Sequence, residues 1–304
     1  MSEIQATVGF VGYGEAASCF TKGLSANGLE RILVYCNGSR NCPPYTQPFK
    51  NRVARDGAET VGSLEDLVAN CDIVFSAVLV GNAVQVGEAI AACVGAGTLV
   101  VDINASPPSA KRAVGTAVTA RGASFVDANL MGAVSIYGHS VQLLSSGDGS
   151  VEFARRMGPF GLNVEVIGNE PGTSAMVKML RSVVTKGMEA LIVEAMTTAH
   201  LAGVTEEAFR GICEPMDATT YSSFADMCIK TDVLHAGRRA VEMDAALAEL
   251  RELGVEPIMT TATVERLRTS ERLGLRDRFV DAPPKTYREV LDAYAAVIRG
   301  SDPV

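Results

Sequence analysis

The chain of 304 residues lacks the patterns that mark metal-binding, membrane and nucleic-acid-binding proteins. Its seven cysteines are scattered and never spaced Cys-x-x-Cys, and it has only three histidines, so no metal site is predicted. It has no cluster of five or more Lys and Arg residues, and its formal net charge is −8, which argues against binding to a nucleic-acid backbone. Charged residues interrupt the longest apolar stretches before they reach the length of a membrane span.

The first residues also lack a targeting signal. Residues 1–5 (MSEIQ) have neither the basic start nor the apolar core of a secretory signal peptide. Together with the unpaired cysteines, this predicts a cytoplasmic protein with reduced thiols. Apolar residues make up 47% of the chain and charged residues 20%, so we expect a sizeable hydrophobic core that needs no disulfides.

Strand and helix patterns alternate through the first half of the sequence and then give way to helices alone. Apolar strands are predicted at 6–12, 31–35, 72–80, 97–104, 124–132, 139–147 and 163–168, and a polar, proline-rich loop at 36–49. Such alternation is typical of a mostly parallel sheet with helices on both faces. From Thr173 to Gly203 there is one long helical pattern, and only helices follow it. We therefore predict an α/β domain of the doubly wound Rossmann type over residues 1–168 and an all-α substrate and dimerisation domain over residues 169–304.

A glycine pattern follows the first predicted strand. Gly12, Gly14 and Ala17 fit Gly-x-Gly-x-x-Gly/Ala, in which the first glycine permits a tight turn and the second lets a pyrophosphate approach the backbone. The helix that begins there offers free N–H groups to the phosphates. A glycine pattern alone is weak evidence, but its place between a strand and a helix favours a dinucleotide site over a merely structural turn.

The end of the second predicted strand bears on the choice of cofactor. NAD-binding domains usually carry an acidic residue there, and this chain instead has Asn37, Ser39 and Arg40. These side chains suit a 2′-phosphate, with Arg40 supplying charge, so NADP is predicted over NAD. The alternative is a solvated loop that carries an arginine by chance.

Four segments, in order, resemble motifs of the β-hydroxyacid dehydrogenases, whose relatives include 6-phosphogluconate dehydrogenase and the imine reductases. The first is the glycine loop GFVGYGEAA. Residues 102–108 (DINASPP) resemble D-x-S-T-x-x-P, and residues 127–133 (DANLMGA) resemble the substrate segment D-A-P-V-S-G-G. Residues 172–182 (GTSAMVKMLRS) resemble G-x-G-x-x-x-K-x-x-N-N, with Lys178 at the catalytic lysine. The run HAGRRAVEM, 235–243, is similar to a less characterised branch of the superfamily.

The resemblance implies roles for particular residues. Lys178 is expected to be the general acid/base. The implied cofactor-binding residues are Gly12, Tyr13, Gly14, Glu15, Ala16, Asn37, Ser39, Arg40, Ala77, Val78, Leu79 and Asn104. The implied substrate-binding residues are Asn129, Met131, Gly132, Ser174, Arg181, Ser182, His235 and Arg239. The chain departs from the family pattern at Met131, which replaces a serine, and at Arg181 and Ser182, which replace paired asparagines.

The helical pattern agrees with a site on the long helix. Ser174, Lys178, Arg181, Ser182 and Thr185 fall on one stripe of a helix that is otherwise largely apolar and expected to be buried, so the stripe is predicted to line a cleft. The alternative is that Lys178 and Arg181 lie on a solvated face. A second face carries His235, Arg238, Arg239 and Glu242, which either bind a substrate carboxylate or phosphate or form a surface row of ion pairs.

Three functions stay open at this point. The first is an NADP-dependent dehydrogenase or reductase acting on a hydroxyl or carbonyl group beside a carboxylate. The second is an imine or enamine reductase, and the third is an NADP-binding regulatory protein without turnover. A small-molecule substrate is expected, with no nucleic-acid or membrane partner, and the apolar surface of the helical half predicts a homodimer.

Overall fold

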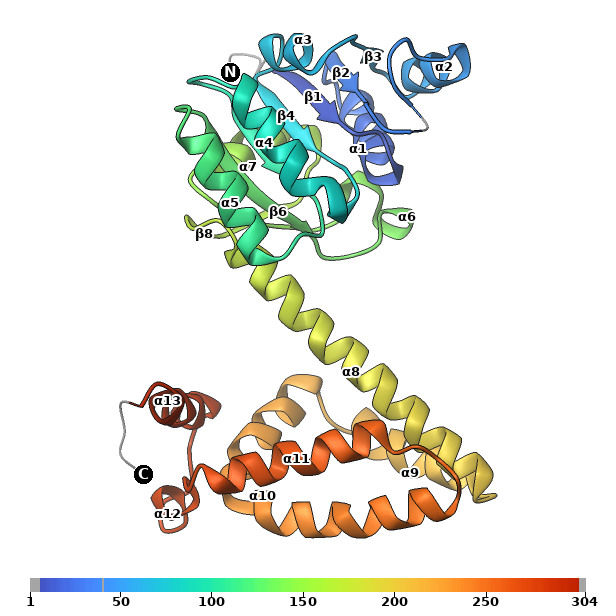
Figure 1. The fold of residues 1–304 in the computed structure, drawn as a ribbon, viewed down its shortest axis with the longest axis vertical. Helices are drawn as coiled ribbons and strands as arrows, with labels where there is room; N and C mark the ends of the chain where they lie inside the picture. The colour runs from blue at the N-terminus through green and yellow to red at the C-terminus, as the bar shows by residue number, and fades with distance from the viewer. Residues whose placement is uncertain (1–5, 40, 301–304) are drawn as a thin grey trace. The chain divides into compact units, whose positions relative to one another are not determined.

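The computed structural model describes residues 6–39 and 41–300, and the chain divides into two compact units, one up to Ser182 and the other from Val183 onward (Figure 1). Among the described residues of the first unit, eight strands form one sheet in the order β3-β2-β1-β4-β5-β6-β7-β8. Neighbouring strands are parallel except β6 and β7, which are antiparallel. The strands are β1 (Thr7–Val11), β2 (Arg31–Tyr35), β3 (Glu59–Thr60), β4 (Ile73–Ser76), β5 (Leu99–Asp102), β6 (Ser124–Leu130), β7 (Leu143–Ser146) and β8 (Val164–Gly168).

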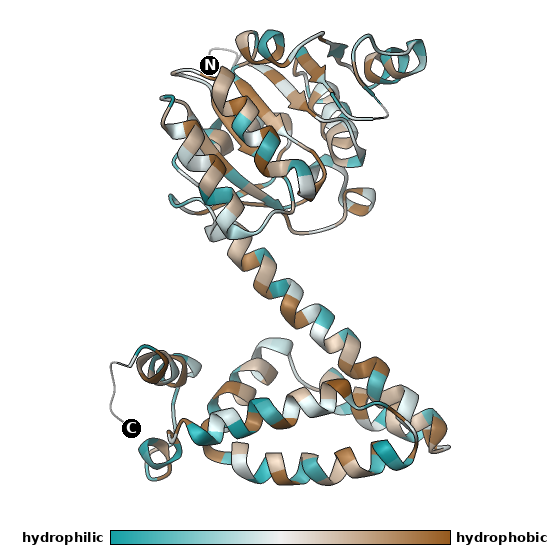
Figure 2. Ribbon diagram, viewed as in Figure 1, coloured by the Kyte–Doolittle hydropathy of each residue, from teal (hydrophilic) through white to brown (hydrophobic). Residues whose placement is uncertain are grey.

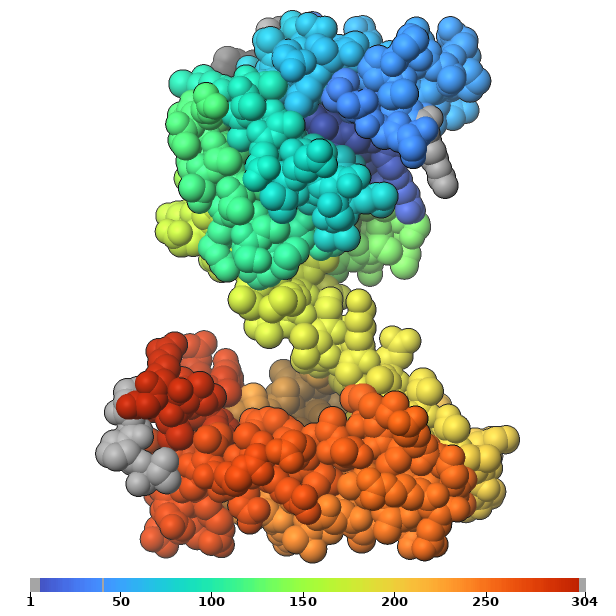
Figure 3. Space-filling model, in the orientation of Figure 1, coloured from blue at the N-terminus to red at the C-terminus, as the bar shows by residue number. Residues whose placement is uncertain are grey.

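Helices cover both faces of this sheet because its strands are apolar on both sides. Within β4, Phe75 packs with Phe20 and Phe153 in one cluster, whereas its neighbour Val74 packs with Ile90 in the other. The central strands β1 and β4 are accordingly coloured mostly as hydrophobic in Figure 2, and α4 and α5 lie side by side over the sheet (Figures 1 and 3). The helices of this unit are α1 (Glu15–Ala26), α2 (Gln47–Arg55), α3 (Leu64–Ala69), η1 (Val80–Asn82), α4 (Ala83–Cys93), α5 (Pro108–Thr119), α6 (Val134–Tyr137), η2 (Gly138–Ser140), α7 (Ser150–Met157) and η3 (Gly158–Phe160). The predicted Rossmann-type sheet is confirmed.

Three local predictions were wrong. The strand predicted over 139–147 begins only at Leu143, because Gly138–Ser140 form the short 3₁₀ helix η2. The strand predicted over 72–80 ends at Ser76, because the backbone N–H of Val78 binds the side chain of Asn104 instead of a neighbouring strand. The loop predicted over 36–49 gives way to α2 at Gln47, where Pro48 stands in the first turn of the helix. Proline is well tolerated there because the first N–H groups of a helix have no partner within it.

The second unit is helical throughout its described residues, as predicted. It contains α9 (Thr205–Asp217), α10 (Tyr221–Glu252), α11 (Ile258–Arg272), α12 (Arg276–Phe279) and α13 (Tyr287–Ile298). Its core brings together Val233, Phe279, Val290 and Tyr294. None of the described helices combines the length and the hydropathy that crossing a membrane requires.

The long helix α8 (Thr173–Leu201) begins in the first unit and continues into the second. Gly203, which has a φ of +75°, follows its end. The helix was expected to be buried apart from its polar stripe, and this was wrong for the single chain. Leu180, Val183 and Val193 are exposed, Val183 to 63%, so apolar side chains face outward along the middle of α8.

Candidate functional site

The glycine loop between β1 and α1 is shaped for a close backbone approach. Gly12 has a φ of +92°, its N–H donates to the carbonyl oxygen of Tyr35 at 2.8 Å, and a Cβ on it would collide with the carbonyl oxygen of Ala77. Gly14 is different: it stands just before α1, and a Cβ on it would meet no atom within 4 Å. Open space beside the N–H groups that begin a helix is what a bound phosphate needs. The loop therefore fits the pyrophosphate of a dinucleotide.

A cavity of about 770 Å³ opens beside this loop. Its size is in the range of pockets that bind small molecules and cofactors. Two cationic side chains border it, Lys22 from α1 and Arg52 from α2, together with one anionic side chain, Glu15. The full lining is Tyr13, Gly14, Glu15, Ser18, Cys19, Lys22, Asn41, Arg52, Val134 and Ser135.

Tyr13 and Asp56 form a buried pair beneath the loop. The hydroxyl of Tyr13 donates to Asp56 Oδ2 at 2.9 Å, and Ser18 Oγ donates to the same oxygen at 2.6 Å. Burial raises the pKa of Tyr13 above its ordinary value. Burial also tends to raise the pKa of Asp56, but the hydrogen bonds from Ser18 and Tyr13 and the charge of Lys22, 3.5 Å away, together outweigh this and lower it. The Tyr13 hydroxyl thus anchors the glycine loop to Asp56 through a buried hydrogen bond, a contact that the glycine pattern does not predict.

The other predicted loop residues differ in exposure. Glu15 is exposed and Ala16 is half-buried. After β2, Asn37 and Ser39 are exposed in a loop that is closed by backbone hydrogen bonds between Gly38 and Asn41. Arg40 lies outside the described residues, so its role at a 2′-phosphate stays a prediction.

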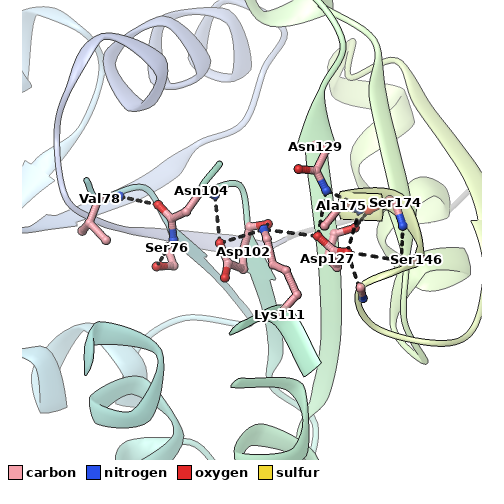
Figure 4. A network of polar contacts seen from close by, with 11 residues as sticks. Ser76, Val78, Asp102, Asn104, Lys111, Asp127, Asn129, Ser146, Ser174 and Ala175 are labelled. Carbon is pink, nitrogen blue, oxygen red and sulfur yellow. Dashed lines mark hydrogen bonds and ion pairs between the residues drawn. The ribbon is translucent and has the colours of Figure 1, made fainter. Parts of the chain in front are cut away.

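The loop after β4 is held by Asn104. The Asn104 side chain accepts a hydrogen bond from the N–H of Val78 at 2.6 Å and donates to Ser76 Oγ at 2.9 Å. Ala77 and Val78 are half-buried, and Leu79 is 80% exposed. Asn104 itself is buried, so what its side chain visibly does is to fix the backbone of this predicted cofactor segment (Figure 4).

The same network continues into a buried cluster of charges that the sequence analysis missed. Lys111 Nζ lies 3.0 Å from Asp102 Oδ1 and 3.2 Å from Asp127 Oδ1, and it donates to the carbonyl oxygen of Asp102 at 2.7 Å (Figure 4). All three side chains are buried. One signal was present, since Lys111 falls on the same helical face as Val114 and Val118, which are core residues.

Asp127 joins this cluster to the beginning of α8. Its Oδ2 accepts hydrogen bonds from the N–H groups of Gly172 at 3.0 Å and Ala175 at 3.1 Å. A carboxylate at this position satisfies N–H groups that have no partner within the helix and complements the helix dipole. The first turn of α8 is therefore fixed to β6.

Two predicted substrate residues, Asn129 and Ser174, meet within this network. Asn129 Nδ2 donates to Asp127 Oδ1 and to Ser174 Oγ, each at 2.8 Å, and Ser174 Oγ donates to the carbonyl oxygen of Asp127 at 2.7 Å. Ser146 Oγ accepts from the N–H of Ser174 at 3.1 Å. Both predicted residues are buried, and their hydrogen bonds join β6 to the first turn of α8. A direct role toward substrate stays a prediction.

Lys178 lies one turn further along α8 and is half-buried. Its pKa is lowered, first by burial, then by the positive charge of Lys111, and less by Arg181, whereas Asp127 acts in the opposite direction. Arg181 is exposed and donates to the carbonyl oxygen of Met131 at 2.6 Å. Met131 and Gly132, the next residue, are half-buried, as is Ser182 on α8.

The remaining predicted substrate residues belong to the second unit. His235 is exposed on α10, and Arg239 donates to Thr231 Oγ1 at 2.9 Å. Arg238 forms an exposed ion pair with Glu242, one of the two arrangements that were considered for this face. A role for His235 and Arg239 in binding stays a prediction. Within the described ranges, His, Cys, Asp and Glu side chains form no group of three or more that could hold a metal ion.

Comparisons with known proteins agree with this arrangement. Residues 7–152 match the family model of the NAD binding domain of 6-phosphogluconate dehydrogenase, and residues 199–270 match a domain of unknown function (DUF1932). A conserved protein of unknown function, whose structure is described as similar to 3-hydroxyacid dehydrogenases, is 30% identical, with 89% of this chain and 98% of that chain covered and a TM-score of 0.61.

Two further solved structures have the same fold. A conserved hypothetical protein from Sinorhizobium meliloti 1021 is 28% identical, with 97% of each chain covered and a TM-score of 0.64. An imine reductase from Aspergillus terreus, solved in complex with NADPH4, is 17% identical, with 89% of this chain and 95% of that chain covered and a TM-score of 0.72. The chain belongs to the NAD(P)-binding dehydrogenases and reductases of the β-hydroxyacid dehydrogenase superfamily, in a branch that joins a 6-phosphogluconate dehydrogenase-like NAD-binding domain to a DUF1932 domain.

Proposed function

We propose that this protein is an NADP-dependent dehydrogenase or reductase that acts on the hydroxyl or carbonyl carbon of a small substrate bearing a carboxylate, with Lys178 as its general acid/base. The observation that carries the proposal is the environment of Lys178. Lys178 is half-buried, and the positive charges of Lys111 and Arg181 act with burial to lower its pKa. A lysine whose pKa is lowered in this way releases its proton at a lower pH than an exposed lysine does, which suits a general acid/base.

The glycine loop and its surroundings would hold the cofactor. The backbone at Gly12 and Gly14 and the first N–H groups of α1 would hold the pyrophosphate, and the loop at Ala77 and Val78 would lie against the nicotinamide half. The nicotinamide supplies or accepts the hydride when the cofactor is bound. The fit rests on the open space beside Gly14, which a side chain at that position would fill.

The preference for NADP rests on charge. The described end of β2 presents Asn37 and Ser39 where an NAD-binding domain usually has an acidic residue, and Lys22 and Arg52 border the adjacent cavity. These features favour the additional phosphate. Comparing the dissociation constants of NADPH and NADH by fluorescence titration tests this, and equal affinities would contradict it.

Lys178 and Arg181 would have different roles toward the substrate, the first in proton transfer and the second in binding a carboxylate. Lys178 would protonate the oxygen of a carbonyl as it becomes an alcohol, or accept the proton in the reverse direction. The guanidinium of Arg181 has five N–H donors, so its bond to the carbonyl of Met131 leaves capacity for a substrate carboxylate. One turn separates the two residues on α8, which suits a substrate whose carboxylate lies close to its reacting carbon.

A panel of oxo acids, hydroxy acids and cyclic imines, assayed by NADPH absorbance, tests the proposal. We expect turnover on an oxo or hydroxy acid, and a loss of 10²- to 10⁴-fold in Lys178→Ala, the usual effect of removing a positioned proton donor. NADPH affinity should be retained. The matched control is Lys186→Ala, which removes an exposed lysine from the same helix and should keep full activity.

Other outcomes would point elsewhere. Turnover on imines alone would favour an imine reductase, and tight NADPH binding without turnover on the whole panel would favour a regulatory protein. Near-normal activity of Lys178→Ala on an oxo acid would assign proton transfer to another group.

We also propose that the protein is a homodimer, because apolar side chains of α8 are exposed in the single chain.

A further inference from the structure

Lys111, Asp102 and Asp127 form a buried cluster of three charged side chains at a place where apolar side chains could also pack between the sheet and α5. Asp102 and Asp127 are paired neighbours on β5 and β6, and two adjacent carboxylates in the interior repel each other unless a cation lies between them. Lys111 supplies that cation from α5. Burying three charges costs free energy, and well-packed apolar side chains are often at least as stabilising. Stability alone therefore does not account for this cluster.

We propose that Lys111 and Asp127 are positioning residues for Lys178. Asp127 fixes the first turn of α8, one turn before Lys178, and the opposed charges of Lys111 and Asp127 set the balance between the ammonium and the free amine at Lys178. The inference rests on the proposed function for its purpose, but the arrangement itself is testable without a substrate.

The mechanical part follows from the contacts of Asp127. One carboxylate oxygen accepts from two N–H groups at the start of α8, and the other accepts from Asn129 and lies beside Lys111. Lys111 is in turn held by Asp102. The beginning of α8 is therefore tied through Asp127 to two strands and to α5, and this fixes the backbone one turn before the position from which Lys178 extends.

The electrostatic part follows from which charged groups influence the pKa of Lys178. They are Lys111 from α5, Asp127 from β6 and Arg181 from α8 itself. Lys111 and Arg181 favour the free amine, and Asp127 favours the ammonium. Arg181 is exposed and therefore screened by solvent, whereas Lys111 and Asp127 are buried and act in a medium of lower dielectric constant. The buried pair thus provides the fixed part of the field at Lys178.

Competitive labelling with acetic anhydride tests this in the full chain. The labelling rate of Lys178 is followed against pH by mass spectrometry of its peptide, and the midpoint reports when the amine is free. We expect the midpoint to rise in Lys111→Met, because a positive charge is lost, and to fall in Asp127→Asn, because a negative charge is lost. Hydrogen exchange across residues 172–178 should also become faster in Asp127→Asn.

The controls separate this effect from general loosening. Arg121→Met removes an exposed cation just beyond the end of α5 and should leave the Lys178 midpoint unchanged, and the labelling curve of Lys186 should be the same in every variant. If Lys111→Met does not fold, Asp102→Asn replaces it, and its midpoint should fall. A purely structural cluster would move the midpoint in the same direction in all folded variants or not at all, and either result would overturn the inference. These outcomes do not depend on turnover, so they are distinct from a failure of the proposed function.

Discussion

Lys178 illustrates at the scale of one residue how the burial of an ionisable group costs stability. Burial makes the charged form of its side chain unfavourable, so the folded protein binds a proton at this residue less readily than the unfolded chain does. The ordinary pKa of a lysine is 10.5, and that of folded Lys178 lies below it. At pH values below the folded pKa, the protein carries the full cost of the buried ammonium, and this cost is relieved as the pH rises toward 10.5.

We therefore expect Lys178→Met to raise the melting temperature at neutral pH. The gain should shrink as the pH rises from the folded pKa of Lys178 toward 10.5, because the wild-type amine then becomes neutral in the folded state as well. Calorimetry of both proteins between pH 6 and about 10 measures this. A lower melting temperature in Lys178→Met at every pH would show that the ammonium stabilises the fold.

Arg181 gives a second prediction at the residue scale. If it binds the substrate carboxylate, Arg181→Ala should raise KM more than it lowers kcat, because an anchor supports substrate and transition state alike. Arg181→Lys keeps the charge but loses the planar pair of N–H donors, so it should restore only part of the affinity. Steady-state kinetics on the substrate that the panel identifies would decide this, and a fall in kcat at unchanged KM would remove Arg181 from the binding role.

At the scale of elements, the two glycines of the loop after β1 are expected to respond differently to substitution. The backbone conformation requires Gly12, whereas Gly14 leaves the space proposed for the pyrophosphate. Gly14→Val should lower the melting temperature only moderately. A Cβ at this position meets no atom within 4 Å, and the expected cost is that of losing a favoured N-cap residue, about 1 kcal/mol. NADPH affinity should fall by at least tenfold, about 1.4 kcal/mol, because the side chain fills the space for the pyrophosphate.

Gly12→Ala is the contrasting variant. Its Cβ collides with the carbonyl of Ala77 in a backbone conformation that disfavours any side chain, so it should lower the melting temperature itself. Thermal unfolding and NADPH titration of both variants separate the two effects. A Gly14→Val protein that is folded and binds NADPH normally would show that this loop is not the cofactor cradle.

Elements with a local signal were predictable, and contacts between distant elements were not. The run Arg31–Tyr35 forms a strand as expected, because its apolar residues fit a sheet buried on both faces. The beginning of α2 was missed because proline and polar residues dominate its first turn. Strand β4 was predicted too long because Ala77 to Val80 continue its apolar pattern after the backbone has left the sheet.

The candidate site likewise contains features that the local sequence predicts and contacts that only the tertiary structure brings together. The glycine pattern predicted the loop after β1, whereas the role that the order of the motifs assigns to Lys178 stays a prediction. The meeting of Lys111, Asp102 and Asp127 depends on the register of β5 against β6 and on the face of α5 that packs on them. That register is a property of the tertiary structure. A lysine in a helical pattern is usually solvated, so only its apolar neighbours Val114 and Val118 indicated that it is buried.

At the scale of the whole molecule, the exposed apolar side chains of α8 remain to be explained. Leu180, Val183, Val184, Ile192 and Val193 are exposed along one helix of the single chain, and exposed apolar side chains in such number often contact another protein. A second copy of the chain is the partner that needs no further component, and twofold pairing would cover the same helix in both copies.

We expect the protein in solution to have twice the chain mass of 31.9 kDa. The double variant Leu180→Glu/Val183→Glu should have the mass of one chain, because two carboxylates on this apolar surface cannot be buried without partners. Ile298→Glu is the matched control, since it places the same charge on an exposed apolar residue of α13 and should not alter the mass. Light scattering after size exclusion measures all three proteins. A wild-type protein of single-chain mass at tens of micromolar concentration would refute dimerisation through α8, since interfaces of obligate size hold at far lower concentrations.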